Sequence, residues 1–537
     1  MKRQNNFKFF ILHYGIIQLF IALMLSVIIT FILGDEWIEM VHSVFPNLDA
    51  SDDTYMLILE AFLFGTILML YRSFLHSVIY HDSTGRNLSK DTGEFHMSYE
   101  YLCRYFRNAD DKRIKESELP TENWRNSEGI ILGKVKNRLV KRASAGVGNC
   151  ALFGRPGDGK TTSQIIPSAL KFEGSVLCID IKGDVKQWTE STRRIKIFNP
   201  DNAKESCCFN PFGDIDKMTL TKVKSFIENM GLALIPDEAG DNSKFFVDGA
   251  RDFWNGISLY MIHEDKNTGF MDIVDAILTS NPFEWVERVV NSTVKESKAF
   301  LAAYLGGNEK NIAGQYKKCC DSLRPFTNGD LPELLSSNKF AITPEMLDEG
   351  YDIYIEIPQD KIDLYAPITT IIINNFMMYF MNRKDSSTGE KLRPILFLLD
   401  EFPQLHFNFN TLTSALATLR SKKVSLFMAQ QSIAQLERRY GDSACREIID
   451  NCAYISVMSA QDPKSREFFQ KLVGSRKTLK VNKSDSTQGN HKTNSRNVQP
   501  VIEPVYQPED FGNLNDKIVI IANGKYIEAD KCKCYET

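Results

Sequence analysis

The chain has 537 residues, 64 Lys+Arg against 68 Asp+Glu, a formal net charge of −4 and 25% charged residues. That length provides for roughly three or four domains, and the near-neutral balance excludes both wholesale disorder and a uniformly basic nucleic-acid-binding surface. The 11 cysteines are an odd count and contain no C-x-x-C pair, which favours a reducing cytosolic environment over a disulfide framework.

The first predicted element is an uncharged, mostly apolar run from Phe9 to Gly34. A helix of this length reaches roughly 39 Å, which is enough to cross a bilayer with some tilt. A cleaved signal peptide is the alternative, but the run is too long for one and no small-x-small cleavage site precedes Asp35. We therefore expect a retained transmembrane helix at about residues 9–34.

A second apolar run extends from about Tyr55 to Tyr71, with Glu60 near its start and Arg72 at its end. Both charged side chains can extend to the membrane interfaces, so a second span at about residues 55–72 is predicted. The run is short for a span, and a buried helix of a soluble domain is the alternative.

The charges around these runs predict their orientation. The intervening loop, residues 35–54, carries six acids and no Lys or Arg, whereas basic residues precede the first run and follow the second. The positive-inside rule places both termini in the cytoplasm and the loop outside. Residues 1–80 are thus predicted to be a two-helix anchor in the lipid bilayer.

Beyond the anchor, short apolar strands alternate with helical segments, which is typical of a parallel α/β domain. This pattern is interrupted twice. Residues 253–340 are rich in helical segments and predict an inserted all-α domain, which divides the α/β domain into residues 81–252 and 341–537. Residues 475–498 are polar, with six Lys or Arg against one Asp, and predict a flexible basic loop.

A phosphate-binding motif follows the strand signal Cys150–Phe153. It matches G-x-x-x-x-G-K-[ST] between a strand and a helix, so backbone N–H groups are expected to surround a polyphosphate. The predicted nucleotide-binding residues are Gly154, Arg155, Pro156, Gly157, Asp158, Gly159, Lys160, Thr161 and Thr162. Lys160 is expected to reach the β- and γ-phosphates of ATP, and Thr161 to bind Mg²⁺. A glycine-rich turn without a ligand is the alternative.

The second nucleotide motif is the apolar strand Pro394–Leu399 followed by Asp400 and Glu401. Asp400 is expected to hold Mg²⁺ through water, and Glu401 to orient and deprotonate the attacking water. An ordinary acidic pair at a strand end is the alternative. Together with the lysine loop, the motif predicts an α/β P-loop NTPase with a mostly parallel central sheet.

Two further features follow along the chain. A polar amide at the tip of the strand from Val424 could sense the γ-phosphate, and Gln430 and Gln431 both stand there. Arg420 lies at a predicted helix end, from which it could reach a neighbouring subunit's nucleotide as an arginine finger. Solvent-exposed glutamines and a solvated arginine are the alternatives.

The order of these motifs resembles the coupling-protein ATPases of type IV secretion and conjugation (the TraG/TraD type), relatives of the FtsK and HerA DNA pumps. The resemblance covers nearly the whole chain. It rests on the two N-terminal spans, on the two nucleotide motifs and on Gly129–Lys134, Asp180–Asp184, Phe209–Phe212, Gln431–Leu436 and the closing segments from Pro508 and Lys517.

The resemblance implies a hexameric ATPase of the RecA/FtsK-like fold in the bacterial inner membrane, around a central channel. In that family the all-α domain between the nucleotide motifs is associated with substrate docking. Carried over by position, Arg420 would act in trans and Gln431 would be the γ-phosphate sensor, with Gln435 nearby. Gln430 stays a rival for the sensor.

The partners implied are the inner-membrane components of the secretion channel and a relaxase–DNA nucleoprotein as substrate. Recruitment of protein effectors instead of DNA is one alternative. A membrane scaffold that nucleotide only switches is another, although the presence of Glu401 argues against it.

Overall fold

The computed structural model describes residues 113, 121–122, 129–136, 138–142, 148–213, 215–237, 241–385, 391–488 and 491–536. The chain divides into two compact units. One consists of Met1–Asp111 with Arg476–Glu503, and the other of Lys112–Ser475 with Pro504–Thr537. The predicted transmembrane spans and the loop between them lie outside the described residues.

The described strands of the larger unit form one twelve-stranded sheet in the order β1-β3-β2-β14-β13-β10-β4-β9-β8-β5-β7-β6. The stretch from β10 to β6 is parallel throughout. Its strands are β4 (Asn149–Phe153), β5 (Ser175–Ile181), β6 (Ile195–Phe198), β7 (Asp352–Ile357), β8 (Ile395–Leu399), β9 (Val424–Gln430) and β10 (Cys452–Val457).

An antiparallel extension continues the sheet beyond β10. It pairs β10 with β13, β13 with β14, β14 with β2, and then β2 with β3 and β3 with β1. Its strands are β13 (Lys517–Ala522), β14 (Lys525–Asp530), β2 (Ile130–Val135), β3 (Arg138–Arg142) and β1 (Thr121–Glu122). The extension joins segments from the two ends of the described chain.

The central strands are buried on both faces, which explains why their sequences are apolar runs rather than alternating patterns. Every residue of β4, β8 and β9 is buried. Along β5, Leu177 and Ile179 belong to one hydrophobic cluster, whereas Val176 and Cys178 belong to another. Successive side chains of a strand point to opposite faces, so each face has its own core.

Helices cover both faces of the sheet. On one face, α4 (Ile166–Lys171) and α5 (Asp184–Thr189) contribute to the smaller cluster. The helices after β7 that contribute to the larger cluster are α14 (Ile362–Met381), α15 (Phe409–Thr418), α16 (Ile433–Tyr440), α17 (Asp442–Asp450) and α18 (Pro463–Val473). The parallel α/β domain that the sequence pattern predicts is thus a sheet between two layers of helices.

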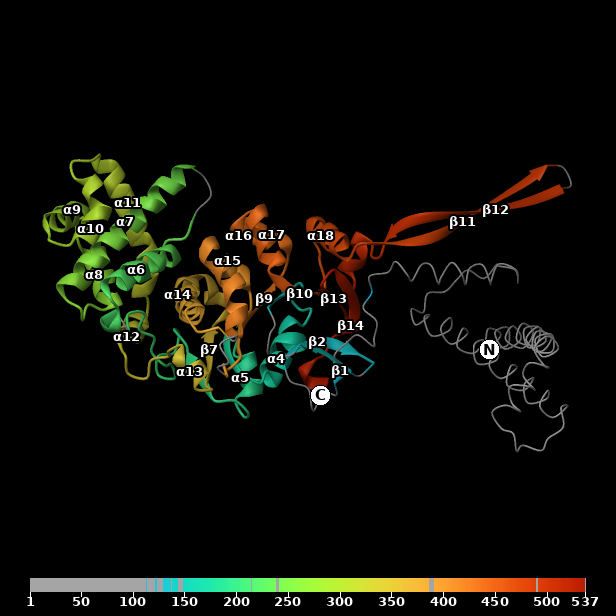
Figure 1. Cartoon of the computed structure of the whole chain (residues 1–537), viewed down its shortest axis with the longest axis horizontal. Helices are drawn as coiled ribbons and strands as arrows, with labels where there is room; N and C mark the ends of the chain where they lie inside the picture. The colour runs from blue at the N-terminus through green and yellow to red at the C-terminus, as the bar shows by residue number, and fades with distance from the viewer. Residues whose placement is uncertain are drawn as a thin grey trace, which may run out of the picture. The chain divides into compact units, whose positions relative to one another are not determined.

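Between β6 and β7 the chain is helical and lies beyond α14 in Figure 1. The helices are α6 (Leu220–Leu234), α7 (Asp241–Glu264), α8 (Phe270–Thr279), α9 (Pro282–Asn291), α10 (Lys295–Leu301), α11 (Glu309–Leu323) and α12 (Leu331–Ser336), and the short α13 (Glu345–Asp348) precedes β7.

The predicted start of the helical insertion at residue 253 is wrong, because it falls in the middle of α7. Val247, Ala250, Phe253 and Trp254 are all buried, a spacing of three and four residues that makes α7 one continuous amphipathic helix. The helical region therefore begins by Leu220. It shares the larger hydrophobic cluster with the sheet, so its packing is continuous with the α/β core.

The segment predicted as a flexible basic loop is instead a β-hairpin. Strands β11 (Ser475–Gln488) and β12 (His491–Pro504) form a two-stranded sheet of their own (Figure 1). An ion pair of 3.1 Å between Arg476 and Glu503 lies at its base. A two-stranded ribbon needs no apolar face, so its polar composition resembles that of a loop; the Gly-Asn dipeptide between the strands was the available turn signal.

In the part of the chain that the structure describes, one helical stretch, Gln359–Met381, is long and apolar enough to cross a membrane. It consists largely of α14, and 67% of its most apolar window is buried inside the protein. These apolar residues serve the core beneath the sheet, where Ile371, Ile372 and Phe376 are almost completely enclosed.

Candidate nucleotide-binding site

The phosphate-loop sequence connects the buried strand β4 to a helical turn. Gly157 and Gly159 have φ values of 87° and 81°, a left-handed backbone that glycine adopts at low cost. The turn η3 (Thr161–Ile165) follows and continues into α4. The Lys160 side chain is only 7% exposed, and its ammonium donates to the Gly154 carbonyl over 3.0 Å. The phosphate loop therefore encloses the side chain of Lys160.

Asp158 holds the loop in this shape. Its carboxylate accepts hydrogen bonds from the backbone N–H of Arg155 over 3.0 Å and from the Arg155 Nε over 2.9 Å. It also accepts one from the Ser459 hydroxyl, which lies just beyond the end of β10. Ser459 was not predicted from the sequence, because its contribution depends on the pairing of β10 beside β4.

The two predicted Mg²⁺ ligands meet across the sheet. Asp400 follows the last residue of β8, and its Oδ2 accepts a hydrogen bond from the Thr161 hydroxyl over 3.1 Å. Both groups supply the hard oxygen atoms that Mg²⁺ prefers, so this pair fits the ion. Burial and the neighbouring Glu401 carboxylate raise the pKa of Asp400, an effect that a divalent cation would oppose.

Glu401 occupies a strained turn next to these ligands. Its φ is 50° and its ψ is 43°, in the left-handed region, and its backbone N–H donates to Asp400 Oδ1 over 3.0 Å. Its carboxylate lies 3.9 Å from the Lys160 ammonium. Such strain is found where the position of a side chain matters for function. The general-base candidate thus lies beside the lysine of the phosphate loop.

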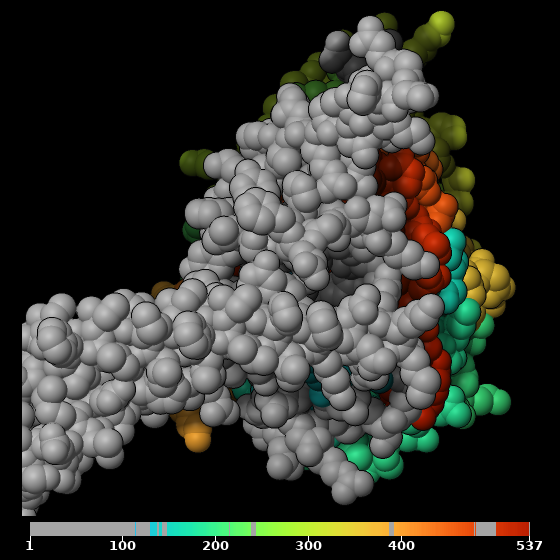
Figure 2. Space-filling model, turned by 90° about the vertical axis from the view of Figure 1, so that its right-hand side faces the viewer, coloured from blue at the N-terminus to red at the C-terminus, as the bar shows by residue number. Residues whose placement is uncertain are grey.

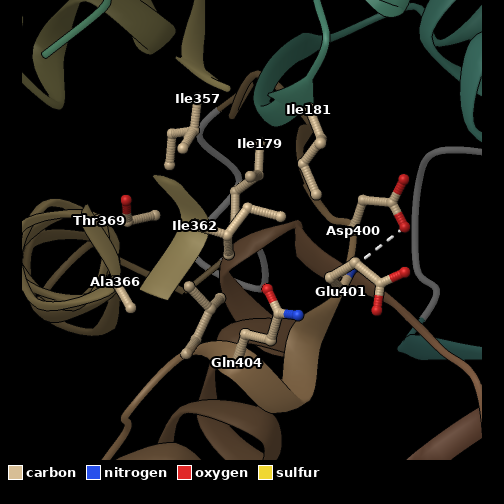
Figure 3. Close-up of a pocket in the computed structure, with 10 residues that line it drawn as sticks. Ile179, Ile181, Ile357, Ile362, Ala366, Thr369, Asp400, Glu401 and Gln404 are labelled. Carbon is tan, nitrogen blue, oxygen red and sulfur yellow. Dashed lines mark hydrogen bonds between the residues drawn. The ribbon is translucent and has the colours of Figure 1, made fainter. Parts of the chain in front are cut away.

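A small hollow adjoins the two carboxylates (Figure 3). Ile179 and Ile181 of β5, Ile357 of β7 and Ala366 of α14 contribute to its wall, and Asp400 and Glu401 lie at one side. None of its lining residues belongs to the phosphate loop. The apolar wall lowers the local dielectric around the carboxylates, consistent with the raised pKa of Asp400.

The structure separates the two candidate sensor glutamines. Gln431 Nε2 donates to the Glu401 carboxylate, 3.3 Å from Oε2 and 3.4 Å from Oε1. The backbone N–H of Gln431 is itself bonded to Gln435 Oε1 over 3.2 Å. Gln430 is 1% exposed at the end of β9, and its side-chain Oε1 has no hydrogen-bond partner among the described residues. Of the two glutamines, only Gln431 contacts the candidate base, Glu401.

Arg420 lies away from this group. It is an exposed residue of η10 (Leu419–Lys422), which precedes β9, and it lies near Gly148, just before β4 begins. Residues before parallel strands lie at the edge opposite the phosphate loop and the carboxylates. Within one chain, the structure therefore brings together Lys160, Thr161, Asp400, Glu401 and Gln431, but not Arg420.

A parallel sheet with a lysine loop after one strand and a carboxylate against that loop after another defines a P-loop nucleotide-binding fold. The chain belongs to the family described as "Type IV secretory system Conjugative DNA transfer", whose sequence profile matches residues 109–537. The resemblance seen in the sequence motifs is thereby confirmed.

Curated relatives share the sequence at low identity. The chain is 21% identical over 390 residues to "Protein VirD4" of Rhizobium radiobacter, covering 70% of this chain and 55% of the relative. It is 25% identical over 387 residues to "Probable conjugal transfer protein TraG" of Sinorhizobium fredii, covering 67% of this chain and 58% of the relative. The chain thus spans somewhat more than half the length of these relatives.

Solved structures share the fold. The plasmid coupling protein TrwB in complex with a non-hydrolysable ATP analogue aligns with a TM-score of 0.60 at 14% identity, covering 79% of this chain and 93% of TrwB. TrwB with ADP and Mg²⁺ aligns with a TM-score of 0.56 at 14% identity, covering 78% of this chain and 92% of TrwB. The predicted P-loop NTPase fold with a mostly parallel sheet is confirmed.

Proposed function

We propose that this protein is a membrane-anchored ATPase that couples a relaxase–DNA nucleoprotein to a type IV secretion or conjugation channel and powers its transfer. The observation that carries the proposal is the convergence of Thr161 and Lys160 on Asp400 and Glu401. Family membership supports the same function, since relatives carry names of conjugal transfer and secretion-coupling proteins.

The site residues suit ATP hydrolysis. Lys160 binds the β- and γ-phosphates, while Thr161 and Asp400 hold Mg²⁺, which neutralises charge on the phosphate oxygens when bound. Glu401 accepts the proton of the attacking water. Gln431 holds the Glu401 carboxylate in place through its hydrogen bond and acts as the sensor of the γ-phosphate. TrwB, which shares the fold, was solved with an ATP analogue and with ADP and Mg²⁺.

We further propose that the active form is a homo-oligomer, a hexamer, in which Arg420 completes the site of a neighbouring subunit. The exposure of Arg420 and its place near Gly148 support this role, because its side chain is far from the phosphate loop of its own chain. An arginine supplied in trans stabilises the charge of the transferring phosphoryl group.

The remaining parts of the chain take the roles that the sequence predicts. Residues 1–80 anchor the protein in the bacterial inner membrane with both termini in the cytoplasm, next to the inner-membrane components of the channel. The helical region from Leu220 to Ser336 docks the substrate; its position between the two nucleotide motifs supports this.

Transfer between cells tests the proposal. Lys160→Ala should abolish ATP binding and plasmid transfer, because the phosphates lose their cation. Normal transfer by this variant would contradict the proposed motor and favour a scaffold. Stimulation of ATP hydrolysis by DNA across a range of salt concentrations tests the cargo; an active ATPase that ignores DNA at every salt concentration would indicate protein effectors instead.

A further inference from the structure

The segment after β14 leaves the sheet beside the phosphate loop. Strand β10 is parallel to β4, and the two antiparallel pairings β10–β13 and β13–β14 make β14 run in the same direction as β4. Both strands therefore end at the same edge of the sheet. Figure 2 shows red atoms from the end of the chain beside blue-green atoms from the early part of the described chain.

Packing fixes this segment on the phosphate-loop helix. The short turn η12 (Cys534–Glu536) contacts η3, the first turn after the loop. Cys534 is 3% exposed and shares a hydrophobic cluster with Ile165 and Ala169. The neighbouring Tyr535 is instead 61% exposed. A buried anchor thus holds an exposed aromatic ring next to the helix that begins at the phosphates.

Lys531 adds a buried cation at the same place. Its side chain is 7% exposed. Burial lowers the pKa of Lys531, while the nearby carboxylates of Asp158 and Asp516 act against that. Because burial disfavours the charged form of this lysine, a further anion within reach of its ammonium would stabilise the charge.

The strand order determines which end of a bound nucleotide would lie near the segment after β14. The Mg²⁺ carboxylates follow β8, which lies on the β9 side of β4, whereas β14 lies on the β10 side. A nucleotide whose γ-phosphate points to Asp400 and Glu401 directs its ribose and base the other way, past the start of η3. That path leads to the segment after β14.

We propose that Lys531–Tyr535 forms the nucleoside side of the nucleotide site, where the Tyr535 ring stacks on the purine base and the Lys531 ammonium binds the phosphates nearest the ribose. This inference rests on the proposed ATPase function. Stacking on an aromatic face tolerates any base, so the contact contributes affinity for ATP and GTP alike rather than choosing between them.

The test compares two ligands on the full-length chain purified in detergent. Isothermal titration measures the affinity for Mg-ATP and for inorganic tripolyphosphate, which has no base. Tyr535→Ala should weaken ATP binding about tenfold, the contribution of one base–aromatic stack, and leave tripolyphosphate binding unchanged. Tyr535→Phe should restore ATP binding. Lys531→Met should weaken both ligands about tenfold, because it removes a charged contact to phosphate.

Phe340→Ala serves as the control, since Phe340 is 76% exposed and lies between α12 and α13. Both affinities should stay at the wild-type value. Unchanged ATP binding in Tyr535→Ala, or an equal loss of both ligands, would overturn the stacking contact, and unchanged binding in Lys531→Met would overturn the lysine contact. Wild-type protein that binds neither ligand would instead refute the proposed ATPase function, and with it this inference.

Discussion

At the scale of single residues, the hydrogen bond between Gln431 and Glu401 distinguishes two adjacent glutamines that the sequence alone left as rivals. Gln431→Ala should lower the kcat for ATP by at least about tenfold with little change in KM, because the base loses the group that positions it. Gln430→Met, a change of a buried side chain that does not contact Glu401, is the matched control. A larger loss of kcat in Gln430→Met would reverse the assignment.

Asp180 gives a residue-scale prediction for pH. Burial raises its pKa to about 6, although its carboxylate caps α5 by accepting the N–H groups of Val185 and Lys186. Since the pKa in the unfolded chain is about 4, the folded state binds the proton more tightly. The contribution of Asp180 to stability is therefore present below pH 4 and is lost as pH rises through 6, by about 3 kcal/mol.

Thermal denaturation between pH 4 and 7 measures this effect. Wild type should lose stability over this range relative to Asp180→Asn, which cannot titrate and keeps one of the two caps. Asp216→Asn, a change of an exposed aspartate, should follow the wild-type profile. Parallel profiles for wild type and Asp180→Asn would show that folding does not raise the pKa of Asp180.

At the scale of elements, the sequence predicts best where local pattern determines the structure. The apolar runs at Cys150–Phe153 and Pro394–Leu399 became β4 and β8, and the polar residues after parallel strands met at one edge. The start of the helical region was misplaced because α7 crosses the point where composition changes. The antiparallel extension was not predicted, because pairing of β14 with β2 depends on contacts distant in sequence.

The hairpin of β11 and β12 should be dispensable for the nucleotide site, since it pairs with no strand of the large sheet. Replacing residues 477–502 by a short Gly-Ser turn should leave DNA-independent ATP hydrolysis within about twofold of wild type. The ion pair of Arg476 with Glu503 remains to close the base. A steady-state ATPase assay checks this, and loss of basal hydrolysis would mean that the hairpin supports the fold of the ATPase.

At the scale of the whole molecule, Arg420 tests whether sites are completed between subunits. Arg420→Ala and Glu401→Gln should each be inactive alone, because one removes the finger and the other the base. Mixed together, they should recover part of the activity, since some interfaces then pair an intact arginine with an intact glutamate. Titration of one variant into the other, followed by ATP hydrolysis, measures this. If the mixtures hydrolyse ATP no faster than the two variants do separately, action in trans is contradicted.

The central claim is that the phosphate loop and the acids after β8 hold one Mg-ATP molecule and hydrolyse it. The most direct measurement is single-turnover ATP hydrolysis beside equilibrium ATP binding for wild type and Glu401→Gln. Glu401→Gln should bind Mg-ATP within about threefold of wild type and lose at least about 10²-fold in the hydrolysis rate, because the proton acceptor is gone while the phosphate contacts remain. Hydrolysis at the wild-type rate by Glu401→Gln would contradict the claim.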